Sequence, residues 1–221
     1  MSPPYLKTDF FERDVLTVAR DLIGVELEWQ GCSGIIVETE AYAVEGDAAC
    51  HTASRPSARE FVLRKPPGTA YVYLNYGMYW LFNLLVKGGG RDGLILIRAL
   101  EPRRGIEQMQ ERRQKQKAHE LCSGPGKLGM ALGITGEHHG TLMAGRGRPA
   151  ACGLRASAGA LPVVADVRVG ISQAADYPWR FLAADHPHVS VPAGRVKPIK
   201  EAARVPLAPA GRYKSGSWRR R

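Results

Sequence analysis

The chain has 221 residues, of which 44% are apolar and 24% charged, and its formal net charge is +10. This length allows one large domain or two small ones, and this composition can form a hydrophobic core, which excludes a wholly disordered chain. The four cysteines show no CxxC spacing, so neither a disulfide framework nor a structural zinc site is indicated. The first residues lack the pattern of a secretory signal, and no apolar run reaches the roughly 20 residues of a membrane helix. We therefore expect a protein that stays inside the cell, with no membrane span.

The positive charge is concentrated in two segments. Residues 103–117 contain six basic and two acidic residues, and residues 195–221 contain nine basic and one acidic. The rest of the chain is slightly acidic, so the two segments could form a patch that faces a polyanion such as nucleic acid. The alternative is a solvated, charge-rich helix followed by a basic tail.

The first third of the chain predicts a helix and a hairpin. Asp9 is placed as the N-cap, with Glu12 three residues later, and apolar residues then recur on one helical face until Gly24. Residues 25–29 and 34–42 alternate like two strands joined by a short turn.

A second hairpin and a further strand follow. Residues 71–74 and 78–86 read as two strands connected through Asn75-Tyr76-Gly77, and residues 94–100 as a buried strand. Residues 105–121 predict an exposed helix, and Gly124-Pro125 opens another that runs to Leu132.

The last third has weaker signals. Residues 136–159 read mostly as loop, and short strands are expected within 163–171, 181–183 and 189–191. No repeat and no linker divides the chain. The economical interpretation is one α+β domain over residues 1–221, with a basic and flexible tail from about residue 195.

One strand carries an unusual set of polar side chains. Because successive side chains of a strand alternate between faces, Glu38, Glu40 and Tyr42 share one face of the strand at 34–42. Glutamate is not favoured in strands, and two on one face repel unless they line a wet or functional cleft. The alternative is an edge strand that turns this face to solvent.

An aromatic residue occupies the tip of the second hairpin. Such tips usually take small polar residues, so Tyr76 suggests a wedge that inserts between stacked bases. The alternative is that Tyr76 folds back onto the core.

Two further motifs could bind a ligand. Gly124, Gly126 and Lys127 at a helix start would direct N–H groups and an ammonium at an anion such as a phosphate, although a tight helix entrance is the plainer interpretation. The segment is not a nucleotide-binding P-loop, because the GxxxxGK spacing is absent. The histidine pairs at 138–139 and at 186 and 188 lack accompanying carboxylates, so we expect no metal site.

Taken in order, the motifs resemble those of the alkyladenine (3-methyladenine) DNA glycosylases. They are Val37-Glu-Thr-Glu-Ala-Tyr42, His51, Pro67-Gly-Thr-Ala-Tyr-Val-Tyr73, Tyr76-Gly-Met-Tyr79, Asn83, Arg98-Ala-Leu-Glu-Pro102 and Glu120-Leu-Cys-Ser-Gly-Pro-Gly-Lys-Leu128. The resemblance covers roughly residues 8–191, while residues 136–159 follow no recognisable pattern and 88–91 look longer than the usual turn. It implies an α+β domain with a curved antiparallel sheet flanked by helices, and removal of damaged purines from duplex DNA.

The resemblance also implies roles for individual residues. Glu40, not Glu38, corresponds to the general base of the family, and Arg98 to a residue that helps to hold the attacking water. The other correspondences are Tyr42, His51 and Tyr73 with the walls around the flipped base, Tyr76 with the side chain that fills the gap in the DNA, and Asn83 with a residue that crowds the amino group of guanine.

The implied reaction is hydrolysis without cofactor or metal, by a monomer acting on double-stranded DNA in the bacterial cytoplasm or in a nucleus. The substrates would be 3-methyladenine and 7-methylguanine, with deaminated or etheno purines in addition. A lyase would need an amine nucleophile, and none is evident. A non-enzymatic protein that binds bent or damaged DNA is the alternative class, but an acid facing DNA would weaken plain binding.

Overall fold

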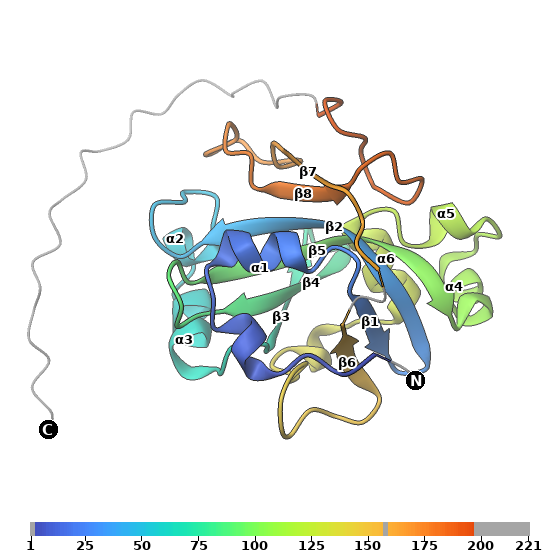
Figure 1. Cartoon of the computed structure of the whole chain (residues 1–221), viewed down its shortest axis with the longest axis horizontal. Coiled ribbons are helices and arrows are strands. Elements are labelled where there is room, and N and C mark those ends of the chain that lie inside the picture. Colours follow the sequence, from blue (N-terminus) through green and yellow to red (C-terminus); the bar gives the residue numbers. More distant parts are fainter. Residues whose placement is uncertain (1–2, 157–158, 197–221) are drawn as a thin grey trace, which may run out of the picture.

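The computed structural model describes residues 3–156 and 159–196, and within them the architecture is a curled antiparallel sheet flanked by short helices (Figure 1). The predicted basic tail lies almost wholly outside the described residues. The strands are β1 (Glu26–Trp29), β2 (Cys32–Ala43), β3 (Ala70–Asn75), β4 (Tyr79–Val86), β5 (Gly93–Arg104), β6 (Cys152–Arg155), β7 (Val163–Asp166) and β8 (Arg180–Ala183). They confirm the predicted α+β class.

Strand β2 is central and has neighbours on both edges. The sheet order is β3-β4-β5-β2-β1-β6, and β8 pairs with the second half of β2 and carries β7 at its own outer edge. All pairings are antiparallel. The edge-strand alternative for β2 is therefore wrong, and its carboxylates lie inside the protein.

The pairing of β2 with β5 is irregular where the carboxylates occur. Its register shifts between Ile36 and Glu38 and again between Glu38 and Thr39. Thr39 lies on the opposite face and donates its hydroxyl to the Ala19 carbonyl at 2.8 Å. A bulge of this kind re-aims side chains, but Glu38 and Glu40 still share one face because both reach Arg98.

The N-terminal helix begins later than its sequence predicts. A 3₁₀ turn, Thr8–Phe11, precedes helix α1 (Val15–Asp21), whose N-cap is Asp14 and not Asp9. The Asp14 carboxylate accepts from the backbone N–H of Leu16 and Thr17, which satisfies two of the free donors at a helix start. Helix α1 lies across the front of the sheet in Figure 1.

The remaining helices are short. They are α2 (His51–Ser54), α3 (Pro56–Arg64), α4 (Ile106–Arg113), α5 (Ala118–Leu121) and α6 (Pro125–Leu132). The predicted helix at 105–121 is interrupted because Gln114 adopts a left-handed backbone conformation, with φ of 52°, and caps α4. The predicted α6 is confirmed to its last residue.

The described part of residues 136–159 is less irregular than expected. They contain a 3₁₀ turn, Gly136–His138, and strand β6, which pairs with β1 along its whole length. The expected strand at 189–191 does not form, and the one expected at 163–171 ends at Asp166.

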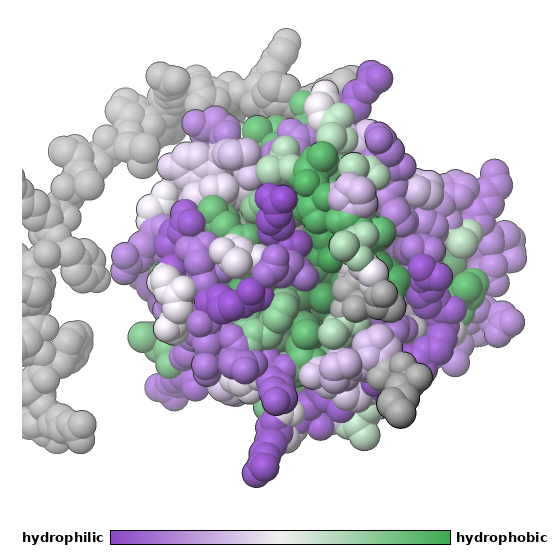
Figure 2. All heavy atoms as spheres, in the orientation of Figure 1, coloured by the Kyte–Doolittle hydropathy of each residue, from purple (hydrophilic) through white to green (hydrophobic). Residues whose placement is uncertain are grey.

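The core is continuous across the sheet, α1, α4 and α6, and polar residues flank an apolar band on the face shown in Figure 2. All four cysteines are buried and free. No helix among the described residues is both long and apolar enough to cross a membrane.

Candidate active site

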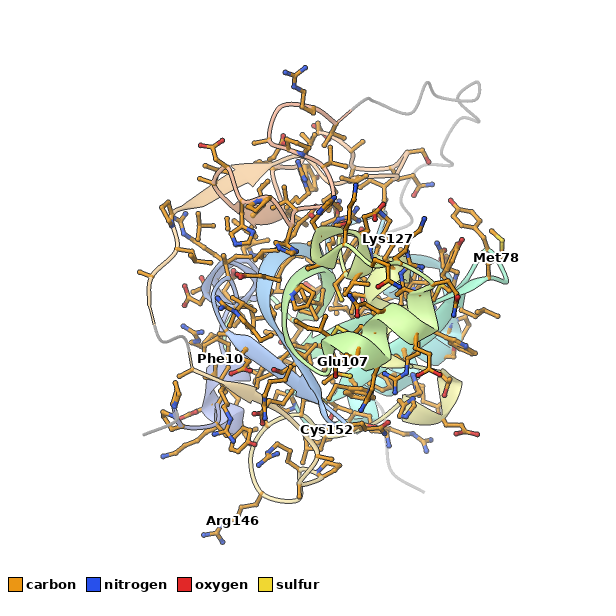
Figure 3. All side chains as sticks on the ribbon, turned by 90° about the vertical axis from the view of Figure 1, so that its right-hand side faces the viewer. Phe10, Met78, Glu107, Lys127, Arg146 and Cys152 are labelled. Carbon is orange, nitrogen blue, oxygen red and sulfur yellow. The ribbon has the colours of Figure 1, made fainter. Side chains whose placement is uncertain are left out.

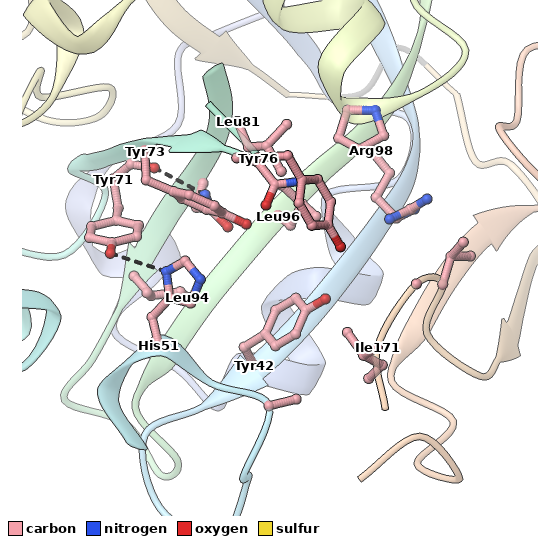
Figure 4. Close-up of a pocket in the computed structure, with 16 residues that line it drawn as sticks. Tyr42, His51, Tyr71, Tyr73, Tyr76, Leu81, Leu94, Leu96, Arg98 and Ile171 are labelled. Carbon is pink, nitrogen blue, oxygen red and sulfur yellow. Dashed lines mark hydrogen bonds between the residues drawn. The ribbon is translucent and has the colours of Figure 1, made fainter. Parts of the chain in front are cut away.

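A cavity of about 350 Å³ opens between β2, the β3–β4 hairpin, β5 and the chain after β7 (Figure 4). Its volume is within the range of small-molecule sites. The residues that line it are Tyr42, Ala49, His51, Tyr71, Tyr73, Asn75, Tyr76, Leu81, Asn83, Leu94, Leu96, Arg98, Pro125, Val169, Gly170 and Ile171. Residues singled out in the sequence are thus brought together from β2, β3, β4, β5, a helix and a hairpin tip.

The Glu40 carboxylate lies directly behind this lining. Its side chain has no solvent exposure. One oxygen accepts from the backbone N–H of Val169 at 2.6 Å, and the other from the Tyr42 hydroxyl at 2.7 Å, with the Arg98 guanidinium 3.2 Å away. All three of these residues line the cavity. The carboxylate is therefore buried behind the cavity wall, in contact with three of the residues that form it.

Glu38 lies further inside and is held by two arginines. One of its oxygens accepts from Arg98 Nε at 3.0 Å, from Arg180 at 2.9 Å and from the Ser190 hydroxyl at 2.9 Å. The other accepts from the Ser190 backbone N–H at 2.6 Å. Both oxygens of Glu38 therefore accept from the protein, and Glu38 fixes the orientation of Arg98, whose other end reaches Glu40.

Arg98 is therefore a bridge between two carboxylates. Burial acts to lower its pKa, but Glu40 and Glu38 outweigh this effect and raise it. The guanidinium is only 7% exposed and stays charged.

Aromatic rings form the walls of the cavity. Burial, and then Glu40, raise the pKa of Tyr42 well above its usual value, so its hydroxyl remains a donor. Burial raises the pKa of Tyr73 to about 12. Burial, and then the nearby Arg55, lower the pKa of His51 to about 4, so its imidazole is neutral at pH 7. The rings of Tyr42, Tyr73 and His51 are therefore all uncharged at pH 7.

The rings are locked to one another and to the strands. His51 Nδ1 and the Tyr71 hydroxyl are 3.2 Å apart, and the His51 and Tyr73 rings meet edge to face with their centroids separated by 4.3 Å. Asn83 is buried and donates its amide to the Tyr71 carbonyl at 3.0 Å. These contacts fix the walls of the cavity against one another.

Tyr76 stands at the mouth of the cavity. It is 81% exposed and has a left-handed backbone conformation, with φ of 49°. The alternative that it folds back onto the core is therefore wrong. Met78, two residues on, projects from the outer end of the same hairpin and is 65% exposed (Figure 3). An apolar tip of this kind is unusual on a soluble surface and indicates a contact site.

The Gly124-Pro-Gly-Lys segment lies beside this hairpin. A Cβ on Gly126 would come within 2.9 Å of the Tyr79 ring, so glycine is required for the close approach of α6 to β4. Gly124 has φ of 147°, and the exposed Lys127 side chain reaches only Ser123, at 3.5 Å. The tight helix entrance is confirmed, and the lysine is available at the surface.

Sequence reasoning did not identify one wall of the cavity. Residues 169–171 form it, although the sequence suggested a strand there. This segment is anchored by Arg168, whose buried guanidinium binds Asp47 with two contacts of 2.6 and 2.9 Å. No short-range pattern connects two residues 121 positions apart, so only a three-dimensional structure could have paired them.

The site combines a carboxylate, a fixed guanidinium and an aromatic cavity beside an exposed tyrosine. No lysine lines the cavity within the described residues, and no cluster of three or more His, Cys, Asp or Glu in that part of the chain could hold a metal ion. Such a site can hold a planar ring and support proton transfer and charge stabilisation at its base.

Comparison with known proteins identifies the family. The family model of methylpurine-DNA glycosylase matches residues 9–187. A "Putative 3-methyladenine DNA glycosylase" of Rhodopseudomonas palustris strain HaA2 is 44% identical over 192 residues, which are 87% of this chain and 92% of the relative. Proteins of the same name from Bradyrhizobium diazoefficiens and Nitrosospira multiformis are 44% and 42% identical, over 81% and 82% of this chain and 90% and 92% of theirs. The chain therefore belongs to the methylpurine-DNA glycosylases, hydrolases that act on the N-glycosyl bonds of methylated purines in DNA.

Proposed function

We propose that this protein is a monofunctional glycosylase that rotates a damaged purine out of duplex DNA and hydrolyses its glycosidic bond with a water activated by Glu40. The substrates would include 3-methyladenine and 7-methylguanine, and also deaminated or etheno purines. The observation that carries the proposal is the Glu40 carboxylate, whose polar contacts are with Tyr42, Arg98 and Val169, three residues that line the cavity.

Extrusion of a nucleotide costs a few kcal/mol of lost stacking and pairing. Tyr76 is exposed at the rim of the cavity, so its ring can enter the stack while the purine enters the cavity. Lys127, at the neighbouring helix start, would contact a phosphate together with the backbone at Gly124 and Gly126. These residues would supply binding and orientation.

The purine would lie against the rings of Tyr42, Tyr73 and His51. Neutral His51 offers either a donor or an acceptor to the base edge without adding charge. Asn83 is fixed by its bond to the Tyr71 carbonyl, and its bulk would crowd the exocyclic amino group of an undamaged guanine. Normal guanine would thereby be disfavoured.

The chemical step follows from the charges at the base of the cavity. As the bond from C1′ to the purine nitrogen breaks, its electron pair leaves with the base and the sugar gains positive charge. A water oxygen bonds to C1′, and Glu40 accepts the proton that this water releases. Arg98 holds the water and keeps Glu40 oriented. The Tyr42 hydroxyl gives up its contact with Glu40 when the water enters.

Hydrolysis without a covalent intermediate is supported by the lining of the cavity. A lyase forms a Schiff base between an amine and C1′, whereas no lysine lines the cavity within residues 3–156 and 159–196. We further propose that the enzyme acts as a monomer on double-stranded DNA, and that it is located where the DNA of the cell lies.

The test is base release by Glu40→Gln in single turnover. Methylated, hypoxanthine-containing and undamaged duplexes are incubated with the protein without added metal, and released bases are identified by chromatography. We expect wild type to release the damaged bases, and Glu40→Gln to bind these duplexes but release none. Near-normal release by the variant would remove Glu40 from this role.

The matched control is Glu45→Gln, which makes the same change five residues away at an exposed carboxylate. It should retain wild-type release. Borohydride added to the wild-type reaction should trap no protein–DNA adduct, and a trapped adduct would replace hydrolysis by a lyase mechanism.

A further inference from the structure

Arg168 is a buried cation that the proposed reaction does not use. Its side chain has no solvent exposure, and it binds Asp47 and the carbonyl oxygens of Ala41 and Ala174, each at 3.0 Å or less. The Ala41 carbonyl belongs to β2, Asp47 to the loop that leads to His51, and Ala174 to the chain that follows the cavity wall. Three walls of the cavity meet at this one guanidinium.

The same guanidinium lies over the ring of Tyr42. Its central carbon is 4.6 Å from the ring centroid, which is within the range of a cation–π contact. Tyr42 lines the cavity, whereas Arg168 does not. The buried cation therefore lies against a ring of the cavity wall but outside the space in which a purine would stack.

Although Arg168 is paired with Asp47, its charge still affects the pKa of Tyr42. Burial and Glu40 raise the pKa of Tyr42, and Arg98 and Arg168 act against that rise. A second guanidinium, that of Arg55, lies 5.5 Å from the centroid of the Tyr73 ring. Both tyrosine walls thus already contact one arginine each.

These contacts change how strongly the cavity attracts a cationic base relative to a neutral one. A purine alkylated at N3 or N7 is cationic, and bare tyrosine faces would attract it more than a neutral purine. When a guanidinium occupies the other face, a cationic base meets a like charge across the thickness of the ring. The cation–π gain is then offset by repulsion, while stacking of a neutral base is not affected.

We propose that Arg168, acting through Tyr42, and Arg55, acting through Tyr73, each reduce the preference of this cavity for cationic purines, so that uncharged purine lesions compete with methylated ones. This inference rests on the proposed function of the same cavity. Arg168 is a positioning residue, because it reaches the base only through the ring.

The experiment compares two lesions in duplexes of one sequence, cationic 7-methylguanine and neutral hypoxanthine, by single-turnover release. The variant Arg168→Met with Asp47→Asn removes both charges of the pair. The asparagine side-chain oxygen can still accept from one of the two backbone N–H groups, those of Ala43 and Ala49, that bind separate oxygens of Asp47. We expect the ratio of 7-methylguanine to hypoxanthine release to rise by about threefold to tenfold, the size of one cation–π contact.

Arg168→Lys is the matched control, because it keeps the charge and loses the two-pronged contact with Asp47. A purely structural role would lower both rates in every variant and leave their ratio unchanged. We expect Arg168→Lys to keep the wild-type ratio even where both rates fall. A wild-type ratio in the double variant would overturn the proposal, and so would an equal rise in Arg168→Lys.

Arg55→Gln keeps the proposal testable if the double variant does not fold, because Arg55 is exposed. Its ratio should rise in the same direction by about twofold, since an exposed cation is more strongly screened. With the double variant unfolded, an unchanged ratio in Arg55→Gln overturns the proposal. Wild-type protein that releases neither base would instead refute the proposed function.

Discussion

Replacing Glu38 by glutamine should destabilise the protein strongly, although the two side chains have almost the same shape. The Glu38 carboxylate is completely buried and accepts from Arg98, Arg180 and twice from Ser190. A glutamine can present only one oxygen. If that oxygen faces the arginines, its NH₂ group faces the Ser190 N–H, and if it is flipped, the NH₂ group faces two guanidiniums.

The magnitude follows from the charges left behind. Removal of one partner from a buried ion pair costs about 3–5 kcal/mol, because the remaining charge stays desolvated. Arg98 keeps Glu40 and Arg180 keeps Asp166, which accepts from Arg180 and from the Gly194 N–H. These remaining partners limit the loss, so we expect about 3 kcal/mol, which corresponds to a fall in Tm of about 6–12 °C for a chain of this size.

Urea unfolding followed by tryptophan fluorescence measures this loss. Glu26→Gln is the matched control, since Glu26 is 23% exposed and its nearest contact is the Ser33 hydroxyl at 2.6 Å. We expect a loss of about 1 kcal/mol or less there. If the free energies of unfolding of the two variants differ by less than about 1 kcal/mol, the buried network does not hold Glu38 as described.

Two further predictions concern the cavity wall and the wedge. His51 is held neutral with a pKa of about 4, so below pH 6.5 the unfolded chain binds more protons than the folded one. The free energy of unfolding should therefore fall between pH 6.5 and 4, and His51→Gln should remove that part of the slope in urea titrations. Tyr76→Ala should lose nucleotide extrusion, read by 2-aminopurine fluorescence, but keep much of its affinity for undamaged DNA; the same fluorescence change as wild type would count against the wedge.

The local elements were predictable because their signals are local. The two hairpins follow from strand alternation and turn residues, and α6 follows from Gly124-Pro125 at its start. The sequence pattern placed the start of the first helix at Asp9, whereas α1 starts after Asp14. Both aspartates precede the apolar residues that α1 buries, so either could act as the N-cap. Asp9 fits the capping box, but the chain from Thr8 to Phe11 forms a 3₁₀ turn and leaves Asp14 to cap the helix. Such competition between adjacent caps depends on packing.

The candidate site could be predicted only in part, for a reason of distance along the chain. Strand periodicity places Glu38, Glu40 and Tyr42 on one face, and this is confirmed by the contacts of both carboxylates with Arg98 and of Tyr42 with Glu40. The residues that hold the Glu38 carboxylate are 60 to 152 positions away from it along the chain. No periodicity reports on such pairs, so the division of roles within β2 emerges only in three dimensions.

That division explains why two buried glutamates can occur on one strand. Glu38 uses both oxygens on donors from β5, β8 and the chain near Ser190, and two of these donors are guanidiniums. Glu40 has two neutral partners and a longer contact with Arg98 of 3.2 Å. A hydroxyl is displaced by water at lower cost than a guanidinium, because displacing the guanidinium also separates two buried opposite charges. Of the two carboxylates, Glu40 therefore fits the proposed contact with a reacting water better, and Glu38 fits the part of holding Arg98 in place.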